Sequence, residues 1–420
     1  MWSKPGNPVA IDPSQVVVGL YVWLDIPWAD HPILTSRLMV RTPKEVAVIK
    51  ASNPAGRLYY YPERSSVVPP PPDAALAAPA ASERAALAHE VEQRRQDKSR
   101  RQHSHSGAQS SASRNWDAAA RATREALTHF AQSPRAAGAR LSQLSSQAAK
   151  AITHGRSVLL HLLGDKNGKG PYYHALNTMT LSLLLGRQAG LGERELADLA
   201  LGALAHDAGK GQIPGPILQT ARRRKFEEDF YRQHVQYSVQ LAAQSGVFTP
   251  GALAVIADHH ETVDGTGWPR GYRESGMPAR ILALVNRFDR LCTPEAADRE
   301  ALTPSEALAF MFRHESTRFD AGLLGMFVSL LGVYPPGTYV KLGNGALAMV
   351  VSPGQQSLQP RVLVYSPEMS HRDAPILDLG EEADLRIVEA LRPEVLPPDV
   401  LVWLNPQQSM TFFYSVHDDS

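Results

Sequence analysis

The sequence predicts a multidomain, mainly α-helical protein with a small α/β module at one end and a small β-rich appendage at the other. Its 420 residues are more than one hydrophobic core normally holds. Four consecutive prolines at positions 69–72 separate two parts of different composition. Between about residues 116 and 331, apolar residues recur at the three- and four-residue spacing of helices.

Residues 1–66 are predicted to form the α/β module. The run at 16–24 is rich in β-forming residues, and 58–61 is a second strand candidate. Thr42 and Pro43 suit the N-cap and first position of a short helix that is expected to run through Ile49.

Residues 67–112 are predicted to be a linker, because a proline run favours extended backbone and cannot enter a core. The basic cluster at 94–101 lies in it. No aromatic residues interleave there to stack on bases, so we interpret the cluster as solvated and expect no nucleic-acid partner.

Residues 113–335 are predicted to be the helical domain with its lead-in helices, and 336–420 the β-rich appendage. In the appendage, strands are expected at 339–342 and 346–351, on either side of the turn signal Asn344-Gly345, and at 361–365 and 401–404. The stretch at 116–163 is expected either to form a homodimer contact or to pack on its own domain.

Composition excludes several classes of protein. A net charge of +1 gives no global field toward nucleic acid or an anionic membrane. One cysteine, Cys292, allows no internal disulfide or thiolate zinc cluster and fits a reducing compartment. No apolar run approaches the roughly 20 residues of a membrane span, and the first residues lack a signal peptide's apolar core. The prediction is a cytoplasmic protein.

Histidines and acidic residues of the helical domain point to metal chemistry. His206-Asp207 ends a predicted helix that begins near residue 193, and Gly209 breaks the helix just beyond. His259-His260-Glu261 ends another helix, which Thr249 and Pro250 begin. Imidazole and carboxylate are ligands for Fe, Mn, Zn and Ni. Two such ions about 3.5–4 Å apart activate a water and neutralise a phosphodiester.

A single histidine on an apolar helical face is more often a hydrogen-bonded core residue than a ligand. Taken alone, His174 and His234 are interpreted as core residues. The same interpretation applies to four further histidines, namely His129, His154, His161 and His314. The HHE motif followed two residues later by DGTGWP is far less likely to arise by chance. Both motifs in one helical domain favour a metal site.

The segment HHETVDGTGWP resembles the HHExxDGxGYP motif of HD-GYP domains, a subgroup of the HD phosphohydrolases, with Trp268 in place of the family's Tyr. The resemblance covers about residues 150–330. GLYVWLDIPWADHP resembles a small domain of unknown role found ahead of HD-GYP domains, and GVYPPGTYVKLGNG resembles a tail found on some members. The resemblance implies an all-helical HD-type core and a phosphodiesterase that hydrolyses cyclic di-GMP to pGpG or GMP with a metal-activated water.

The resemblance also implies roles for individual residues. Two divalent transition-metal ions are expected, Fe or Mn in preference to Zn or Ni. Their implied ligands are His174, His206, the bridging Asp207, His234, His259, His260 and Asn286. Lys210 is implied to hold a phosphate oxygen or to orient the attacking water. The loop residues Asp264, Gly265, Gly267, Trp268 and Pro269 are implied to border the substrate and, in the family, to contact GGDEF diguanylate cyclases. For Trp268 and Pro269, a rigid turn packed on the core is an equal alternative.

Two positions depart from the family pattern. Asn286 stands where the family has a ligand Asp, which removes one negative charge unless Asp289, one helical turn on, compensates. Gly170 replaces a Glu of the three-metal members, so at most two ions are expected. Two hypotheses follow: a working phosphodiesterase, or a weak or inactive module that binds cyclic di-GMP or a GGDEF partner. A nucleotidase acting on monoesters is disfavoured by the DGTGWP loop.

Overall fold

The computed structural model describes residues 7–25, 37–51, 57–72, 118–154, 157–163, 171–220, 222–295, 300–367, 374, 376–382, 385–405 and 411–417. The basic cluster at 94–101, most of the predicted linker and Gly170 lie outside these residues. The chain divides into a unit of 1–108, 339–349 and 362–404 and a unit of 109–338, 350–361 and 405–420. Within the described ranges, no helix combines the length and apolar character that a membrane span requires.

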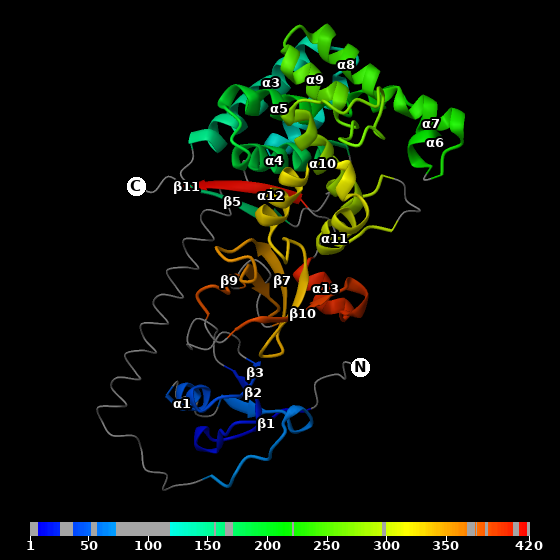
Figure 1. The fold of residues 1–420 in the computed structure, drawn as a ribbon. Helices are drawn as coiled ribbons and strands as arrows, with labels where there is room; N and C mark the ends of the chain where they lie inside the picture. The colour runs from blue at the N-terminus through cyan, green and yellow to red at the C-terminus, as the bar shows by residue number, and fades with distance from the viewer. Residues whose placement is uncertain are drawn as a thin grey trace. The chain divides into compact units, whose positions relative to one another are not determined.

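The second unit is a bundle of helices (Figure 1). Its helices are α3 (Pro134–His154), α4 (Pro171–Gln188), α5 (Glu193–Ala205), α6 (Gly215–Gln219), α7 (Lys225–Arg232), α8 (His234–Ser245), α9 (Pro250–Asp258), α10 (Met277–Cys292), α11 (Pro304–His314) and α12 (Ala321–Leu331). Helix α4 is buried on every side from residue 173 to 186 and packs against α3, α5, α10 and α12. A helix that is buried on every side lies in a core, even though the buried part of α4 includes polar residues such as His174 and Asn177, so α4 is the centre of the bundle.

Helix ends place the histidine motifs as the sequence predicts. The Thr249 hydroxyl accepts a hydrogen bond from the Ala252 N–H at 3.0 Å, with Pro250 at the first position of α9. Helix α5 ends at Ala205, and the 3₁₀ turn η4 (Ala208–Gln212) follows. A Cβ on Gly209 would lie 2.3 Å from the His234 carbonyl oxygen, so only glycine lets η4 approach α8 this closely.

One strand interrupts the region predicted to be helical. Strand β5 (Ser157–Leu163) pairs antiparallel with β11 (Thr411–His417), in a register that runs from Ser157↔His417 to Leu163↔Thr411. The last strand of the predicted appendage therefore pairs within the helical unit. The domain boundaries themselves stay predictions.

The N-terminal module has an antiparallel sheet in the order β1-β4-β2-β3 and one α-helix among its described residues. Its elements are β1 (Val9–Ala10), β2 (Tyr21–Leu24), β3 (Arg37–Met39), α1 (Pro43–Ala51) and β4 (Leu58–Tyr60). The strand expected at 16–24 is wrong over its first half, because the chain turns there and Gly19 has φ of +100°. Val16 and Leu20 are fully buried in the core of this module, so their apolar character reflects packing without a strand.

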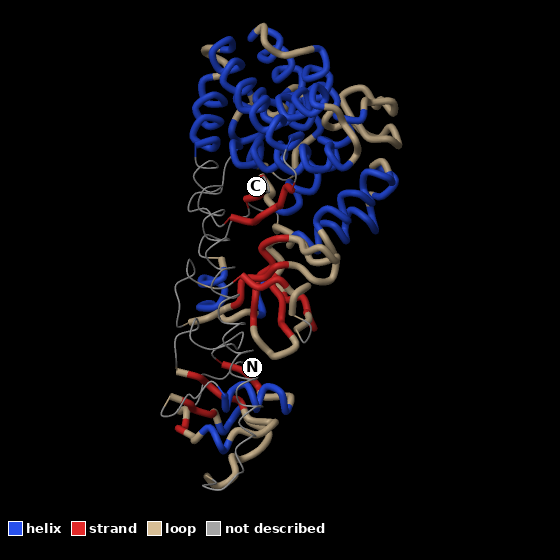
Figure 2. The backbone as a smooth tube through the Cα atoms, turned by 90° about the vertical axis from the view of Figure 1, so that its left-hand side faces the viewer, coloured by secondary structure: helices blue, strands red, loops and turns tan. Residues whose placement is uncertain are grey.

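The C-terminal strands form a second sheet, in the order β10-β6-β7-β8-β9 (strands are red in Figure 2). They are β6 (Tyr339–Leu342), β7 (Leu347–Ser352), β8 (Arg361–Val364), β9 (Ile376–Asp378) and β10 (Ile387–Leu391). The hairpin at Asn344-Gly345 is confirmed, with Lys341 opposite Leu347 and Gly345 at φ of +86°.

The strand predicted at 401–404 is wrong, because these residues end helix α13 (Pro398–Leu404). Pro398 suits a first helical position. Val400 and Leu404 are both buried and lie four residues apart, which is the helical period.

Candidate metal centre

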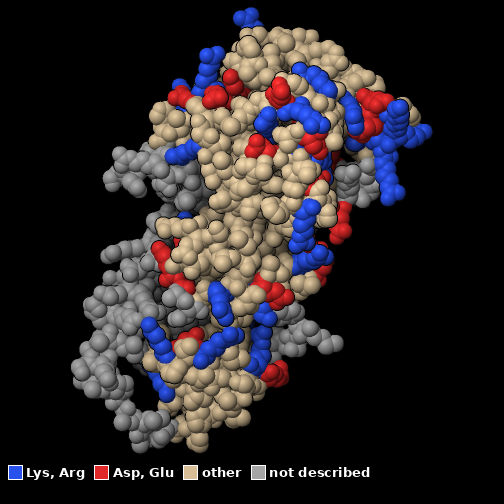
Figure 3. Space-filling view, in the orientation of Figure 1, with Lys and Arg blue, Asp and Glu red and all other residues tan. Residues whose placement is uncertain are grey.

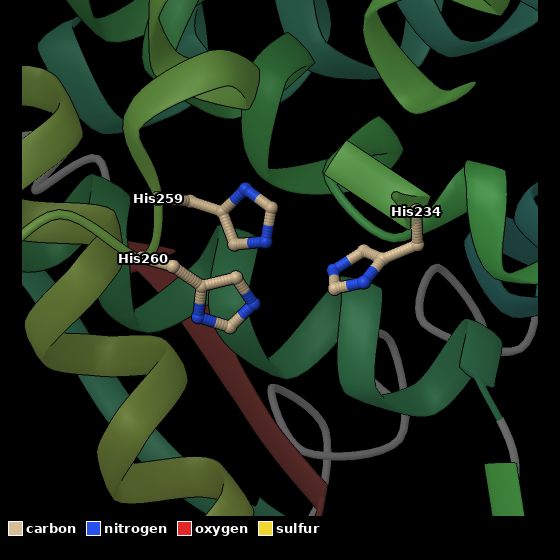
Figure 4. Close-up of side chains that lie close together, drawn as sticks. All are labelled: His234, His259 and His260. Atoms are coloured by element: carbon tan, nitrogen blue, oxygen red, sulfur yellow. The ribbon is translucent and has the colours of Figure 1, made fainter. Parts of the chain in front are cut away.

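Three histidines meet at the ends of two helices (Figure 4). His234 is the first residue of α8, His259 is the C-cap of α9, and His260 follows it. Each offers a ring nitrogen within 4.8 Å of those of the other two. Figure 4 shows the ring of His234 directed at the other two rings from across the site. We call these three residues the tri-histidine group.

The backbone fixes which nitrogen is free in the rings of His234 and His259. Nδ1 of His234 donates to the Tyr231 carbonyl at 2.7 Å, and Nδ1 of His259 donates to the Ile256 carbonyl at 2.6 Å. A carbonyl oxygen can only accept, so the proton is on Nδ1 and Nε2 carries a lone pair.

These lone pairs point into a site that suits a cation. Nε2 of His234, His259 and His260 is buried without a hydrogen-bond partner. Burial is the main cause that lowers the pKa of all three imidazoles, well below the usual value for His259 and His260, and keeps them neutral. Buried unpartnered acceptors are costly, and a divalent ion would satisfy all three. The residues present therefore fit a metal.

A second set of donors, the His-His-Asp group, comprises His174 of α4 and His206 and Asp207 just after α5. The Nε2 atoms of the two histidines are 3.1 Å apart. Nδ1 of His206 donates to the Ala203 carbonyl at 2.7 Å, and Nδ1 of His174 donates to Asp289 Oδ2 at 2.6 Å. Burial, with help from a nearby arginine, lowers the pKa of His174 to about 4. The Nε2 atoms of the two rings thus face each other, an arrangement that a cation between them would stabilise.

Asp207 lies between the tri-histidine group and the two histidines of its own group. Its Oδ1 is 3.4 Å from His234 Nε2 and 3.9 Å from His259 Nε2. Its Oδ2 is 3.4 Å from His206 Nε2 and 3.5 Å from His174 Nε2. Burial opposes its ionisation, but Lys210, His206 and Arg290 outweigh burial and hold its pKa well below the usual value. An ionised carboxylate with one oxygen toward each group is the geometry of a bridging ligand.

Helix α10 contributes two residues that sequence reasoning weighed. Asn286 Oδ1 is buried without a hydrogen-bond partner. Asp289 accepts hydrogen bonds from His174 Nδ1 and, at 2.9 Å, from Asn177 Nδ2. Asp289 therefore orients His174 from behind the ring, as carboxylates commonly do for ligand histidines, and does not stand in for the carboxylate missing at Asn286.

Sequence reasoning missed Arg290 and Glu295. Arg290 donates to Asp207 Oδ2. Lys210 Nζ lies 2.9 Å from the same oxygen and 3.0 Å from Glu295 Oε2. Burial lowers the pKa of Lys210, but its acidic neighbours more than offset this and keep the amine protonated. The sequence did contain a signal for Arg290, because this residue is four positions after Asn286 and therefore lies on the same helical face.

The loop after His260 holds its own shape through hydrogen bonds. Asp264 Oδ1 accepts from the Thr262 hydroxyl at 2.6 Å and from the Thr266 N–H at 2.9 Å, so it acts within the loop. Gly265 has φ of +78°, and the bond between Trp268 and Pro269 is cis.

Trp268 is the loop residue that reaches the donors. Its ring stacks on that of His260, with centroids 3.9 Å apart and planes at 22°, and is 5.4 Å from that of His234. The turn interpretation and the site interpretation of Trp268 are therefore compatible, because the turn holds the indole ring against His260, which is one of the donors. The functional roles of the five predicted loop residues stay predictions.

Gly267→Ala is expected to disrupt this loop, because the new Cβ would lie 2.5 Å from both the His260 carbonyl oxygen and the Thr262 nitrogen. These backbone atoms cannot yield without moving His260. We expect a loss of about 1–3 kcal/mol, the usual cost of overpacking, and weaker metal retention, measured by thermal unfolding and elemental analysis. Gly211→Ala is the control, since its Cβ would meet nothing within 4 Å. Equal effects of both changes would contradict the prediction.

A cavity of about 260 Å³ opens beside the donors. Its lining includes His259, His260, Asn286, Tyr231, Trp268 and four arginines, namely Arg223, Arg287, Arg290 and Arg318. Three glutamates, namely Glu228, Glu261 and Glu295, also line it, so the arginines exceed the carboxylates by one positive charge. This excess suits an anionic ligand. On the face of this unit that Figure 3 shows, acidic and basic side chains are interspersed.

The single histidines interpreted as core residues lie elsewhere. His129, His154 and His314 are exposed, so the core interpretation is wrong for them. His129 and His154 are at helix surfaces, where Nδ1 contacts the carbonyl four residues before, at 2.9 and 3.0 Å. The side chain of His161 is outside the described residues.

Comparison with known proteins places the donors in a family. Residues 139–323 match the HD domain, and residues 9–152 match a domain of unknown function, DUF3391. The middle of the chain is an HD domain. Every residue of the two donor groups falls inside it, and the resemblance stated from the motifs is confirmed.

Relatives of the HD domain are named phosphodiesterases. The chain is 28% identical over 249 residues to a cyclic di-GMP phosphodiesterase of Pseudomonas aeruginosa, covering 58% of this chain and 60% of that one. It is 32% identical over 142 residues to the cyclic di-GMP phosphodiesterase response regulator RpfG of Xanthomonas campestris, covering 33% of this chain and 37% of that one. It is 30% identical over 176 residues to a 3'3'-cGAMP-specific phosphodiesterase of Vibrio cholerae, covering 40% of this chain and 37% of that one. The matches thus span less than two thirds of these relatives' lengths.

Proposed function

We propose that this chain is a metal-dependent phosphodiesterase of the HD-GYP type that hydrolyses cyclic di-GMP to pGpG or GMP. The observation that carries the proposal is Asp207, an ionised carboxylate with one oxygen toward each of two histidine-rich donor groups. Two ions held there would polarise the phosphodiester and lower the pKa of the attacking water. Iron or manganese is the proposed metal, with zinc or nickel as alternatives.

The chain's own residues suit this substrate. Lys210 is protonated and buried at Asp207, where it would donate to a phosphate oxygen or orient the water. The arginines of the cavity attract the phosphate. Tyr231 and Trp268 line the same cavity and offer aromatic faces on which a guanine would stack. A volume of about 260 Å³ holds part of a cyclic dinucleotide, so the remainder would extend past the rim.

A second candidate function is a weak or inactive HD-GYP module that binds cyclic di-GMP, or a GGDEF-domain protein, without turnover. Asn286 favours it, because this residue lines the cavity beside the donors and lacks the negative charge of a carboxylate. A GGDEF partner, a homodimer and a cytoplasmic location also stay predictions.

One assay separates the candidates. Purified full chain loaded with Mn²⁺ is incubated with cyclic di-GMP, 3'3'-cGAMP or GMP, and products are followed by chromatography. We expect wild type to form pGpG or GMP from cyclic di-GMP and Asn286→Asp to be about tenfold faster, since it restores a charge beside the ions.

The other outcomes each point elsewhere. An inert wild type with an active Asp variant would support the binding module. Turnover of 3'3'-cGAMP alone would change the substrate. Turnover of GMP without either cyclic dinucleotide would indicate a nucleotidase. Two inert proteins with metal fully bound would refute the proposal.

A further inference from the structure

The two oxygens of Asp207 have unequal surroundings. Oδ2, which faces His174 and His206, accepts from Arg290 and lies 2.9 Å from Lys210 Nζ. Oδ1, which faces the tri-histidine group, is buried and accepts no hydrogen bond. The tri-histidine group therefore faces a carboxylate oxygen without a hydrogen-bond partner. The oxygen that faces His174 and His206 is shared with two cationic side chains.

The charges make this asymmetry matter for ion binding. A guanidinium stays positive at every ordinary pH, and Arg290 is only 21% exposed, so solvent screens it weakly. Two positive charges at Oδ2 repel a divalent ion that approaches His174 and His206. Asn286, being neutral, adds no charge to offset them.

Glu295 gives Arg290 a second carboxylate. Its Oε2 is 3.8 Å from Arg290 Nη1 and 3.0 Å from Lys210 Nζ. Arg290 can therefore leave Asp207 without losing all ionic partners, since a small rotation would bring it fully onto Glu295. Such a movement would uncover Oδ2 for an ion.

We propose that Arg290 competes with a metal ion for Asp207, so that the tri-histidine group binds one ion tightly and the His-His-Asp group binds a second ion weakly. The second ion enters when Arg290 turns to Glu295. This inference rests on the proposed metal-dependent function and adds a control element within the same site.

The test is calorimetric titration of the chelator-stripped full chain with Mn²⁺ alone, with elemental analysis of the bound metal. We expect wild type to show one tight and one weak class of site. Arg290→Gln removes the charge at similar size, and it should tighten the weak class at least about tenfold, which is a small part of the effect of one nearby charge at an effective dielectric constant of about 20. Arg290→Lys keeps the charge and should leave the second class weak.

Further variants assign the two classes and control for general effects. His234→Ala should remove the tight class and His206→Ala the weak one. Arg287→Gln is the matched control, because this arginine lies on the same helix and lines the same cavity but pairs with Glu315 at 2.6 Å. It should leave both classes as in wild type. Circular dichroism checks that each variant is folded.

Several results would overturn the inference: two equally tight ions in wild type, no change in Arg290→Gln, or the same change in Arg287→Gln. The titration contains no nucleotide. A chain that binds ions as described but leaves cyclic di-GMP intact would therefore refute only the proposed function. A chain that hydrolyses cyclic di-GMP with two equally tight ions would refute only the role of Arg290.

Discussion

Asp207→Asn is expected to abolish phosphodiesterase activity and to weaken ion binding in both donor groups. The carboxylate directs one oxygen toward the tri-histidine group and the other toward His174 and His206. Its negative charge is also what offsets Lys210 and Arg290. An amide of the same shape would leave Glu295 as the single carboxylate beside these two cations among the described residues. We expect turnover of cyclic di-GMP to fall at least a hundredfold, because the loss of a bridging ligand removes about several kcal/mol of transition-state stabilisation.

The same substitution should destabilise the metal-stripped chain, by on the order of 3 kcal/mol, because a buried pair that loses one partner leaves an uncompensated charge. Turnover, metal content and thermal unfolding are measured together. Asp258→Asn is the control. Asp258 is the residue next to His259, and its buried carboxylate also pairs with an arginine, Arg270. This variant should keep both ions. Full activity in Asp207→Asn would remove the basis of the proposed function.

Phe288→Ala is expected to have the largest effect on stability. Phe288 of α10 and Phe327 of α12 are both fully buried, and their rings meet edge to face with centroids 5.1 Å apart. Loss of a buried phenylalanine costs about 3–5 kcal/mol, which lowers the unfolding temperature of a domain of this size by about 10 °C. The packing matters for the site because Phe288 fixes the helix that carries Asn286, Asp289 and Arg290.

Thermal and denaturant unfolding measure this loss. Phe312→Ala is the matched control, because this phenylalanine of α11 is 62% exposed and should change stability by less than about 0.5 kcal/mol. At a temperature where Phe288→Ala is still folded, His174 should also be less well oriented, since its partner Asp289 is the next residue on α10. Equal unfolding temperatures for the two variants would show that this face of α10 does not hold the helix in place.

Local sequence signals located much of the site. A threonine and a proline begin α9 where the capping pattern predicts, so His259 and His260 fall at its C-terminal end. The His206-Asp207 pair follows the end of α5 in the same way. Such signals act over a few residues, because a cap or a turn satisfies backbone groups of its immediate neighbours.

Where local signals failed, burial had overridden them. The apolar run at 16–24 resembled one strand, but the first part fills the core of its module as a turn. The residues at 401–404 have strand-forming side chains, yet Val400 and Leu404 bury one helical face. Composition alone cannot separate these cases, since the same side chains suit a strand and a core.

The sequence by itself determined the helical HD core, the two histidine motifs and the neutral residue at position 286. Only the tertiary structure decided that Asp207 faces both donor groups, that Asp289 orients His174 from 115 residues away, and that Arg290 shares Asp207 with any incoming ion. The reason is physical. Propensities and caps are properties of neighbouring residues, whereas the charge around a buried carboxylate depends on which distant helices pack against it.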